Sequence, residues 1–407
     1  MNFFVVILIS ICICMVSAEI HAVLLAGSHL YYNYRHQADI CHAYHVLIDH
    51  GVKPENIITM AYDDIANNSL NPYPGKIFNK PDGNDVYAGC VLDYTGDEVT
   101  PENFVAVLTG NSTATGGKKV LNSTAADDVF INFADHGGAG LVAVINEYLY
   151  ADQLINALKT MHDKKMYNKL LFYMEACEAG SMFTHLPNNL SILAHTAANP
   201  DESSFGCYCH PDDSVNGKYI GSCLGDTWSV SWMEDSDSRD LSSYTVNDQY
   251  NTILKLVTHS HPTIYGDLSI GKDNVSTYQG ENKKPAEEWT AWLAKLIMGS
   301  HDQEAHVQDS RKIKLSHLKI QYERNPTLEN MREYHDEIES IEFFDTTFKK
   351  IDQKIGKTPG SLQESSIRLP EDLSCLRAAV KAFERDCAKF SDYGLKYTKN
   401  LAHLCYR

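Results

Sequence analysis

Residues 129–138 read Val-Phe-Ile-Asn-Phe-Ala-Asp-His-Gly-Gly, and residues 170–181 read Leu-Leu-Phe-Tyr-Met-Glu-Ala-Cys-Glu-Ala-Gly-Ser. Each stretch begins with an apolar run that is typical of a buried strand. Two neighbouring parallel strands with these endings would present His136 and Cys177 at the carboxyl edge of one sheet, where reacting groups gather. A thiol beside an imidazole is the minimum equipment for covalent attack on an amide, so the pair indicates a cysteine peptidase.

The chain around these two stretches alternates short apolar runs with helical segments from His21 to about Gly280. We expect further strands over 21–26, 56–61 and 190–197, and helices over 39–49, 101–108 and 151–161. Strands that alternate with helices predict parallel βαβ units with right-handed crossovers. The predicted fold class is therefore α/β, with a mostly parallel sheet sandwiched by helices and no glycine-rich nucleotide fingerprint.

The pattern changes after Gly280. Residues 281–288 are polar, and almost nothing beyond them is typical of a strand. Two segments, 327–355 and 371–390, are predicted to be helical. In the second, four apolar residues recur at steps of three and four and so share one face; they are Leu373, Leu376, Val380 and Phe383. We predict a separate helical domain at this end.

Length and charge limit the possible classes of protein. At 407 residues the chain is long enough for two domains, and 43% hydrophobic residues suffice for buried cores. The net charge is −18, and no stripe of Lys and Arg is present, which argues against nucleic acid as a partner. From residue 287 onward the chain has 20 acidic and 19 basic residues, so nearly all of the negative charge lies before the helical end, where it favours solubility.

The amino terminus has the pattern of a signal peptide. Residues 1–18 contain no Asp, Glu, Lys or Arg, and an apolar block is followed by the small residues of Val16-Ser17-Ala18. The alternative is a membrane anchor, but the apolar block is shorter than the ~20 residues that a bilayer requires. We therefore predict a signal peptide over 1–18 and no membrane anchor.

Secretion changes the interpretation of the cysteines. Of eleven cysteines, Cys12 and Cys14 lie in the predicted signal peptide, so nine remain. An odd number in an oxidising compartment leaves at least one thiol unpaired, and Cys177 is the natural candidate. Passage through a glycosylating route also fits five Asn-x-Ser/Thr sequons, at Asn67, Asn111, Asn122, Asn189 and Asn274.

A thiol that cleaves peptide bonds needs a base and donors for the developing oxyanion. Cys177 is the predicted nucleophile. His136 would take its proton or hold it as an ion pair, which would lower the pKa of the thiol. The N–H groups of Gly137 and Cys177 are the expected oxyanion hole.

Further motifs extend this pattern along the chain. Residues 32–39 read Tyr-Asn-Tyr-Arg-His-Gln-Ala-Asp, 62–66 read Tyr-Asp-Asp-Ile-Ala, 196–199 read Thr-Ala-Ala-Asn, and 232–236 read Trp-Met-Glu-Asp-Ser. Together with the two strand endings, these motifs resemble the legumain family of caspase-like cysteine peptidases, the asparaginyl endopeptidases or vacuolar processing enzymes. The resemblance covers about 22–280 and continues more faintly over the tail.

The resemblance implies a domain organisation. It implies a caspase-like catalytic domain over 19–280, a linker or activation peptide over 281–326, and an all-α, death-domain-like prodomain over 327–407. The prodomain would act as an intramolecular inhibitor of a zymogen. Candidate processing points are Asn282, Asn325 and Asn330, although Pro326 disfavours cleavage after Asn325.

The resemblance also implies roles for individual residues. Asn33 would orient His136 in a Cys177–His136–Asn33 arrangement, and Asp135 would tune the histidine. The pocket for the residue before the cleaved bond would be formed by Arg35, His36, Glu175, Ser203, Ser204 and Asp226. From the residues alone, a structural ion pair is the preferred interpretation of Arg35 with Glu175. For Asp135, a solvated loop carboxylate fits equally well.

The implied activity is a cysteine endopeptidase that cleaves after Asn through a thioester on Cys177. Asp would become cleavable in acid if Asp226 or Glu175 gains a proton. No cofactor or metal is expected. The expected partners are protein and peptide substrates and cystatin-type inhibitors, in the secretory pathway, a lysosome or vacuole, or outside the cell. Two alternatives stay open, namely a peptide ligase or transpeptidase that uses the same site, and a catalytically weak glycoprotein that binds partners.

The cysteines and one turn differ from the family pattern. The resemblance implies disulfides Cys209–Cys223 and Cys375–Cys405, and leaves the partners of Cys41, Cys90 and Cys207 open. A second tail bridge of the family would need a partner for Cys387 beyond this sequence, so we expect a more easily released tail. Where the family has Asn-Gly, this chain has His29-Leu30, which tolerates positive φ less well, so the turn is expected to differ.

Overall fold

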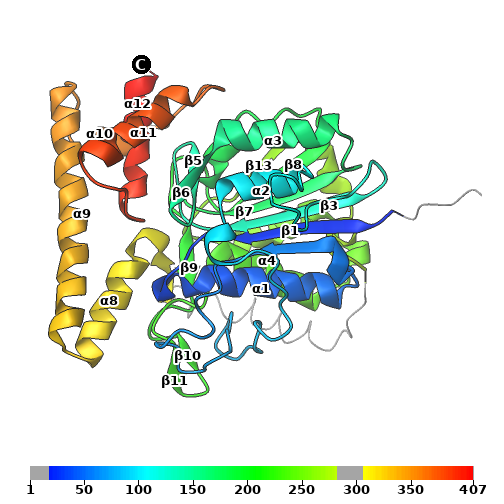
Figure 1. Cartoon of the computed structure of the whole chain (residues 1–407), viewed down its shortest axis with the longest axis horizontal. Coiled ribbons are helices and arrows are strands. Elements are labelled where there is room, and N and C mark those ends of the chain that lie inside the picture. Colours follow the sequence, from blue (N-terminus) through cyan, green and yellow to red (C-terminus); the bar gives the residue numbers. More distant parts are fainter. Residues whose placement is uncertain (1–17, 282–305, 407) are drawn as a thin grey trace, which may run out of the picture.

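The computed structural model describes residues 18–281 and 306–406, and its centre is a six-stranded sheet (Figure 1). The strands lie in the order β13-β8-β7-β3-β1-β2, and all neighbours are parallel except β13 with β8. Their bounds are β1 (Ile20–Ala26), β2 (Ile57–Met60), β3 (Asp128–Ala134), β7 (Leu170–Glu175), β8 (Ile192–Thr196) and β13 (Thr263–Gly266). The predicted mostly parallel sheet is therefore confirmed.

Helices cover both faces of this sheet, as predicted. They are α1 (Tyr34–Asp49), α2 (Pro101–Leu108), α3 (Ala151–Asp163), α4 (Thr227–Ser238), α5 (Val246–Leu256) and α6 (Ser276–Gln279). Figure 1 shows α2 and α3 on one side of the sheet and α1 and α4 on the other. Because side chains alternate along a strand, Leu25 of β1 belongs to the core beneath α2 and α3. Its neighbour Leu24 belongs to the core beneath α1, α4 and α5.

Helix α2 begins and ends where the sequence predicts. The Thr100 side chain accepts a hydrogen bond from the Asn103 backbone N–H at 3.1 Å, and Pro101 occupies the first turn, where no N–H is needed. Helix α1 begins at Tyr34, five residues before the predicted start. Its first turns carry buried polar side chains, including Arg35 and Gln37, which the apolar pattern could not reveal.

Three small sheets were not predicted, because every one of their strands is only two to four residues long. One contains β4 (Gly137–Gly138), β5 (Leu141–Val144) and β6 (Glu147–Tyr150), and a second contains β10 (Ser214–Val215) and β11 (Lys218–Tyr219). The third joins β9 (Phe205–Cys207) to β12 (Gly225–Asp226) and to β14 (Gln308–Asp309). Strand β14 comes from the segment that was predicted to be a linker.

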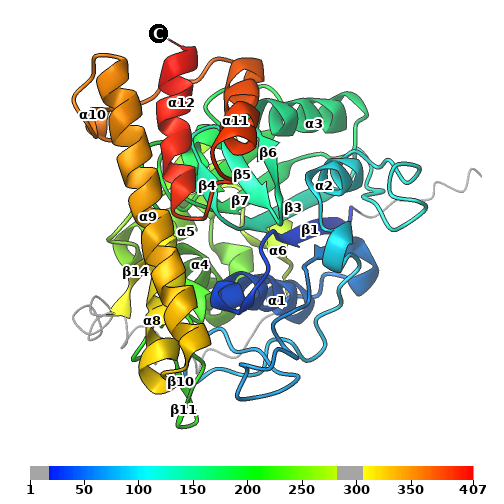
Figure 2. The same ribbon diagram turned by 60° about the vertical axis from the view of Figure 1, so that its left-hand side comes forward.

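The carboxyl-terminal part is helical, as predicted, and stands against the edge of the sheet where the strands end (Figures 1 and 2). Its helices are α8 (Ile313–Arg324), α9 (Leu328–Lys354), α10 (Ser361–Glu364), α11 (Ser374–Asp386) and α12 (Thr398–Cys405). Helix α8 lies within the segment expected to be a linker and packs beside α9. This carboxyl-terminal part, residues 306–406, is called the tail below, and residues 18–281 the catalytic part. The two touch closely, since a Cβ added to Gly138 would lie only 2.7 Å from the Leu395 carbonyl oxygen.

Aromatic rings form the core of the tail. The Phe348 and Tyr397 rings stack with centroids 4.4 Å apart, and Phe348 also contacts Phe383. The four apolar residues predicted to share a face on the 371–390 helix are all buried. This tail core is continuous with the core beneath α2 and α3. The two parts of the chain are therefore packed together rather than merely connected.

Three disulfides are present in the described residues. They join Cys41 to Cys90, Cys209 to Cys223, and Cys375 to Cys405. Three thiols in this part of the chain are free, of which Cys177 and Cys207 are buried and Cys387 is exposed.

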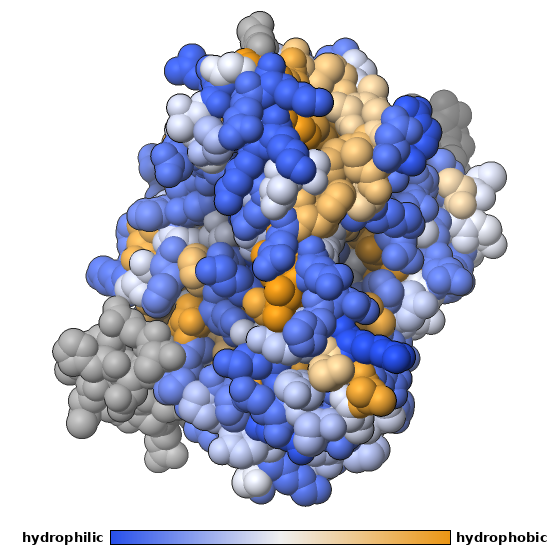
Figure 3. All heavy atoms as spheres, turned by 90° about the vertical axis from the view of Figure 1, so that its left-hand side faces the viewer, coloured by the Kyte–Doolittle hydropathy of each residue, from blue (hydrophilic) through white to orange (hydrophobic). Residues whose placement is uncertain are grey.

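The surface of the tail face is mostly hydrophilic with scattered apolar areas (Figure 3). Four sequon asparagines are exposed, whereas Asn274 is half-buried and donates its amide to the Ser242 carbonyl. Within residues 18–281 and 306–406, no helix is long and apolar enough to cross a bilayer. The predicted signal peptide, apart from Ala18, and the candidate processing site Asn282 lie outside the described residues.

Candidate active site

The pairing of β3 with β7 brings the two predicted reactive residues to the same height. Ala134 lies opposite Glu175, so His136 and Cys177 each follow their strand by two residues. Gly137 fits closely against the other strand ending, since a Cβ there would lie 2.1 Å from the Cys177 carbonyl oxygen. The backbone of Gly137 can make this approach only because it has no side chain.

Asn33 fixes the orientation of the His136 ring. The Nε2 atom of His136 lies 2.8 Å from Asn33 Oδ1, and the Asn33 amide nitrogen donates to the His29 carbonyl at 2.9 Å. Since Asn33 Oδ1 is an acceptor, Nε2 carries the proton and Nδ1 carries the lone pair. The Nδ1 atom is buried and has no hydrogen-bond partner. This arrangement leaves a neutral imidazole whose Nδ1 lone pair is available to accept a proton.

The thiol of Cys177 is protonated and therefore neutral in this structure, in which the tail packs against the catalytic part. Its sulfur accepts a hydrogen bond from the Ser204 N–H at 3.3 Å and lies 3.7 Å from Ser204 Oγ. Burial raises the pKa of Cys177 to about 11, and burial lowers the pKa of His136 to about 4. The sequence led us to expect a lowered thiol pKa. The structure differs from this expectation because both groups are buried, which disfavours the charged pair.

A buried group of charged side chains lies beside this pair. Arg35 Nε donates to Asp226 Oδ1 at 2.9 Å, and Arg35 Nη1 donates to Asn33 Oδ1 at 3.3 Å. Glu175 Oε2 accepts from both the N–H and the hydroxyl of Ser229 at 3.0 Å. Three polar atoms of this group are buried without a hydrogen-bond partner, namely Arg35 Nη2, Glu175 Oε1 and Asp226 Oδ2. A ligand with matching polar atoms would supply the hydrogen-bond partners that these three atoms lack.

Burial raises the pKa values of both Asp226 and Glu175. Arg35 partly offsets this effect at both carboxyls. The group therefore holds one cation and acids that readily gain a proton.

Asp135 and His36 connect the reactive pair to this charged group. Asp135 Oδ1 accepts from the His136 N–H at 2.6 Å and lies 3.7 Å from His36 Nδ1, and His36 Nε2 lies 3.5 Å from Asp226 Oδ2. Asp135 is only 3% exposed, so it is not a solvated loop carboxylate.

One donor atom each from His36, Asp135 and His136 lies within 4.8 Å of the others, close enough to consider a metal. However, His36 Nδ1 lies 2.6 Å from Ser28 Oγ, and His136 Nε2 bonds to Asn33. These ring nitrogens are therefore already engaged by protein groups.

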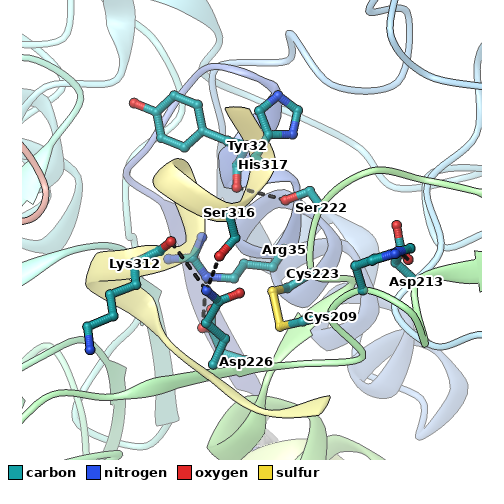
Figure 4. The surroundings of a disulfide bond; sticks show 12 residues. Tyr32, Arg35, Cys209, Asp213, Ser222, Cys223, Asp226, Lys312, Ser316 and His317 are labelled. Atoms are coloured by element: carbon teal, nitrogen blue, oxygen red, sulfur yellow. Dashed lines mark hydrogen bonds and ion pairs between the residues drawn. A yellow bond between two sulfur atoms is a disulfide. The ribbon is translucent and has the colours of Figure 1, made fainter. Parts of the chain in front are cut away.

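A segment of the tail crosses the site. Strand β14 pairs antiparallel with β9, and the Ser310 N–H then donates to the Ser204 carbonyl at 3.1 Å. Figure 4 shows α8 and the segment before it lying over Arg35, Asp226 and the Cys209–Cys223 disulfide. Ile313 packs directly on this disulfide. Further along the tail, Asp392 Oδ2 lies 3.3 Å from His136 Nε2.

The turn before Asn33 keeps a conformation that suits glycine. Leu30 has φ 73° and ψ 146°, and its side chain is 47% exposed. The Leu30 carbonyl accepts from the Asn33 N–H at 2.9 Å, and its N–H donates to Asp64 Oδ2 at 2.6 Å. Leu30 therefore adopts a positive φ despite its side chain, and these hydrogen bonds hold it there.

Sequence reasoning missed one residue beside the thiol. Glu178 follows Cys177 directly, is 3% exposed, and forms an ion pair with Arg311 of the tail. Burial raises the pKa of Glu178 to about 7, although Arg311 opposes the shift. The position next to the nucleophile was visible in the sequence, but its partner 133 residues away was not.

Comparison with known proteins gives the relationships of this chain. The model of the peptidase C13 family matches residues 20–281, and that of the legumain prodomain matches residues 328–407. The chain belongs to the peptidase C13 family. This C13 peptidase is accordingly a cysteine endopeptidase that is made as a zymogen with its own prodomain, and the resemblance to legumain is confirmed.

Relatives of this C13 peptidase include plant and mammalian proteins. A vacuolar-processing enzyme of Citrus sinensis is 40% identical over 404 residues, which cover 94% of this chain and 81% of that protein. Legumain of Mus musculus is 49% identical over 261 residues, which cover 63% of this chain and 58% of that protein. Among solved structures, caspase-1 from Spodoptera frugiperda aligns over 66% of this chain and 93% of its own, with 10% identity and a TM-score of 0.40.

The buried neutral thiol gives a first prediction. In the full-length C13 peptidase at pH 7, iodoacetamide should label Cys387 readily and Cys177 very slowly, because Cys387 is exposed whereas Cys177 is buried and protonated. Mass spectrometry of peptides over time measures both rates in one sample. Labelling of Cys177 as fast as that of Cys387 would contradict the closed, neutral site.

The strained turn gives a second prediction. Leu30→Gly should raise the free energy of unfolding by about 1 kcal/mol, because relief of a positive φ exceeds the added entropy of glycine in the unfolded chain. Leu268→Gly is the matched control, since Leu268 is also exposed, at 56%, but has no positive φ. Thermal melting of both variants provides the measurement. Equal destabilisation of the two would show that the Leu30 turn stores no strain.

Proposed function

We propose that this peptidase cleaves proteins on the carboxyl side of Asn, using Cys177 as nucleophile, His136 as base and Asn33 as the orienting residue. Arg35, Glu175 and Asp226 would bind the Asn side chain, with His36, Ser203 and Ser204 completing the pocket. Gly137 and Cys177 would supply the oxyanion N–H groups, and Asp135 would tune His136.

The observation that supports this specificity is the set of three unpartnered atoms beside the thiol. An Asn side chain has one carbonyl oxygen and one NH₂ group. Its oxygen can accept from Arg35 Nη2, and its two N–H groups can donate to Glu175 Oε1 and Asp226 Oδ2, all of which are buried and have no hydrogen-bond partner. An apolar or cationic side chain would leave some of these atoms unsatisfied, which costs about 1–3 kcal/mol for each group.

The proposed reaction uses the free Nδ1 of His136. This atom takes the thiol proton as the Cys177 sulfur forms a bond to the Asn carbonyl carbon, and the oxyanion N–H groups stabilise the negative oxygen. When the C–N bond breaks, the proton passes from His136 to the leaving amine, and a thioester remains. Water, deprotonated by His136, then attacks the thioester, and the thiol leaves with the returned proton.

The same proposal includes how the zymogen is organised. The proposed boundaries fit the change from an α/β to a helical fold and the position of β14 across the site. They are a catalytic domain over 19–280, an activation segment over 281–326 and a prodomain over 327–407. Release of the tail would open the site. The candidate cleavage points are Asn282, Asn325 and Asn330, and of these three a cut after Asn282 precedes β14 and so separates it from the catalytic part. Asn325 is exposed at the end of α8, but Pro326 follows it. Protein and peptide substrates are the expected partners, with cystatin-type inhibitors also expected.

A secretory origin would place the protein in a vacuole or lysosome. Two groups of relatives carry names that fit this location, namely vacuolar-processing enzyme and legumain. The four exposed sequons at Asn67, Asn111, Asn122 and Asn189 are compatible with glycosylation.

The specificity can be tested with acid-treated full-length protein and a peptide library. We expect cleavage after Asn, complete loss of cleavage in Cys177→Ala, and retention in Cys207→Ala, a matched change of the other buried free cysteine. Asp226→Asn should lower kcat/KM for Asn peptides on the order of a hundredfold, because a buried charged partner is lost. Cleavage by Cys177→Ala, or no preference for Asn, would overturn the proposal.

The buried carboxyls predict how specificity depends on pH. The pKa values of Glu175 and Asp226 are raised by burial, so as the pH falls these carboxyls gain protons at a higher pH than ordinary carboxyls do. Loss of negative charge removes repulsion of a substrate carboxylate, and the ratio of Asp to Asn cleavage should therefore rise. Asp226→Asn should already show a raised ratio at pH 7. A ratio that stays constant with pH in the unaltered protein would contradict this account.

A further inference from the structure

The tail segment is bound across the active site in the manner of a peptide. Gln308 and Asp309 pair antiparallel with β9, and the Ser310 N–H donates to the Ser204 carbonyl at 3.1 Å. The Ser204 N–H in turn donates to the Cys177 sulfur at 3.3 Å. Ser310 therefore lies beside the thiol, where the residue before a cleaved bond would lie. Arg311 is the next residue past the thiol.

Arg311 is held by the residue that follows the nucleophile. Its guanidinium forms an ion pair with Glu178 Oε2 and donates from Nη1 to Ser203 Oγ at 2.7 Å. The two side chains are 7% and 3% exposed. The backbone of Glu178 is fixed as well, because its N–H donates to the Glu202 carbonyl at 2.7 Å. This is a preformed site for a cation, one residue beyond the cleavage position.

Release of the tail changes the charge balance at Glu178. The cations that act on its carboxylate are Arg311 and Lys399, and the opposing anion is Asp309. All three belong to the tail. When they leave, the Glu178 carboxylate stays beside the thiol without either cation. A carboxylate in such a position is stabilised by any cation that takes the place of Arg311.

We propose that Glu178 selects a basic residue, Arg or Lys, immediately after the cleaved bond of the substrate. The inference rests on the proposed function, because it needs cleavage by Cys177 after a residue held in the adjoining pocket. In this interpretation Arg311 is the intramolecular example of the preferred side chain. Glu178 is then a second specificity determinant, on the opposite side of the cleaved bond from Arg35, Glu175 and Asp226.

The test uses the acid-activated full chain and peptides that differ only after Asn, with Lys, Arg, Ala or Glu at that position. We expect kcat/KM for Lys and Arg to exceed that for Glu by about tenfold or more, as for other buried charge-assisted contacts. An Asn-aminocoumarin substrate, which has no residue after Asn, measures the pocket and the thiol separately. Its hydrolysis together with equal cleavage of all four peptides would overturn this inference alone. Failure to hydrolyse it would overturn the proposed function, and this inference with it.

Charge variants separate recognition from a structural role. Glu178→Gln should remove most of the preference and Glu178→Lys should invert it in favour of Glu, each judged as a ratio between peptides after normalisation to the aminocoumarin substrate. Asp201→Asn is the matched control. Asp201 also loses a tail cation, Lys399 at 3.0 Å, but it does not contact Arg311, so the preference should persist. An unchanged ratio in Glu178→Gln, or a lost ratio in Asp201→Asn, would overturn the assignment.

Discussion

The parallel pairing of β3 with β7 is the constraint on which the rest of the site depends. It places the loop after His136 beside the loop that contains Cys177. Because Gly137 has no side chain, its backbone can pack closely against the Cys177 carbonyl. The positions of the thiol, the imidazole and the first residue of β4 all follow from that contact. A shift of one residue in register would turn every side chain of the shifted strand to the opposite face and move the two loops apart.

A second constraint is the burial of several acids around one arginine. Arg35 is fully buried, and Asp39, Glu175 and Asp226 share its surroundings. Desolvation raises the pKa values of all three carboxyls, because a single cation cannot compensate them fully. Such a group is costly for stability when empty and gains from any neutral polar ligand that supplies both donors and an acceptor. The same buried charges that destabilise the empty pocket therefore favour the binding of such a ligand.

The sequence predicted the strands that carry His136 and Cys177, the limits of α2, and the helical character of the tail, since each has a strong apolar period or a local cap. It did not predict the start of α1, because site residues there are polar and yet buried. It also missed β14, which has only two residues and exists through pairing with β9. The contact between Glu178 and Arg311 joins residues that are 133 positions apart and meet only through folding, so no local pattern could indicate it.

The ion pairs that close the site lie within one covalent chain. Arg311 with Glu178, Arg377 with Asp152, and Lys399 with Asp201 join the tail to the catalytic part. While the chain is intact, each pair forms at an effective concentration that tethering sets near the millimolar range, so modest contacts suffice to keep the site closed. After a cut on the amino-terminal side of β14, the same contacts become bimolecular. Closure of the site then depends on dilution, which does not affect the intact chain, and responds more strongly to salt, which screens the ion pairs.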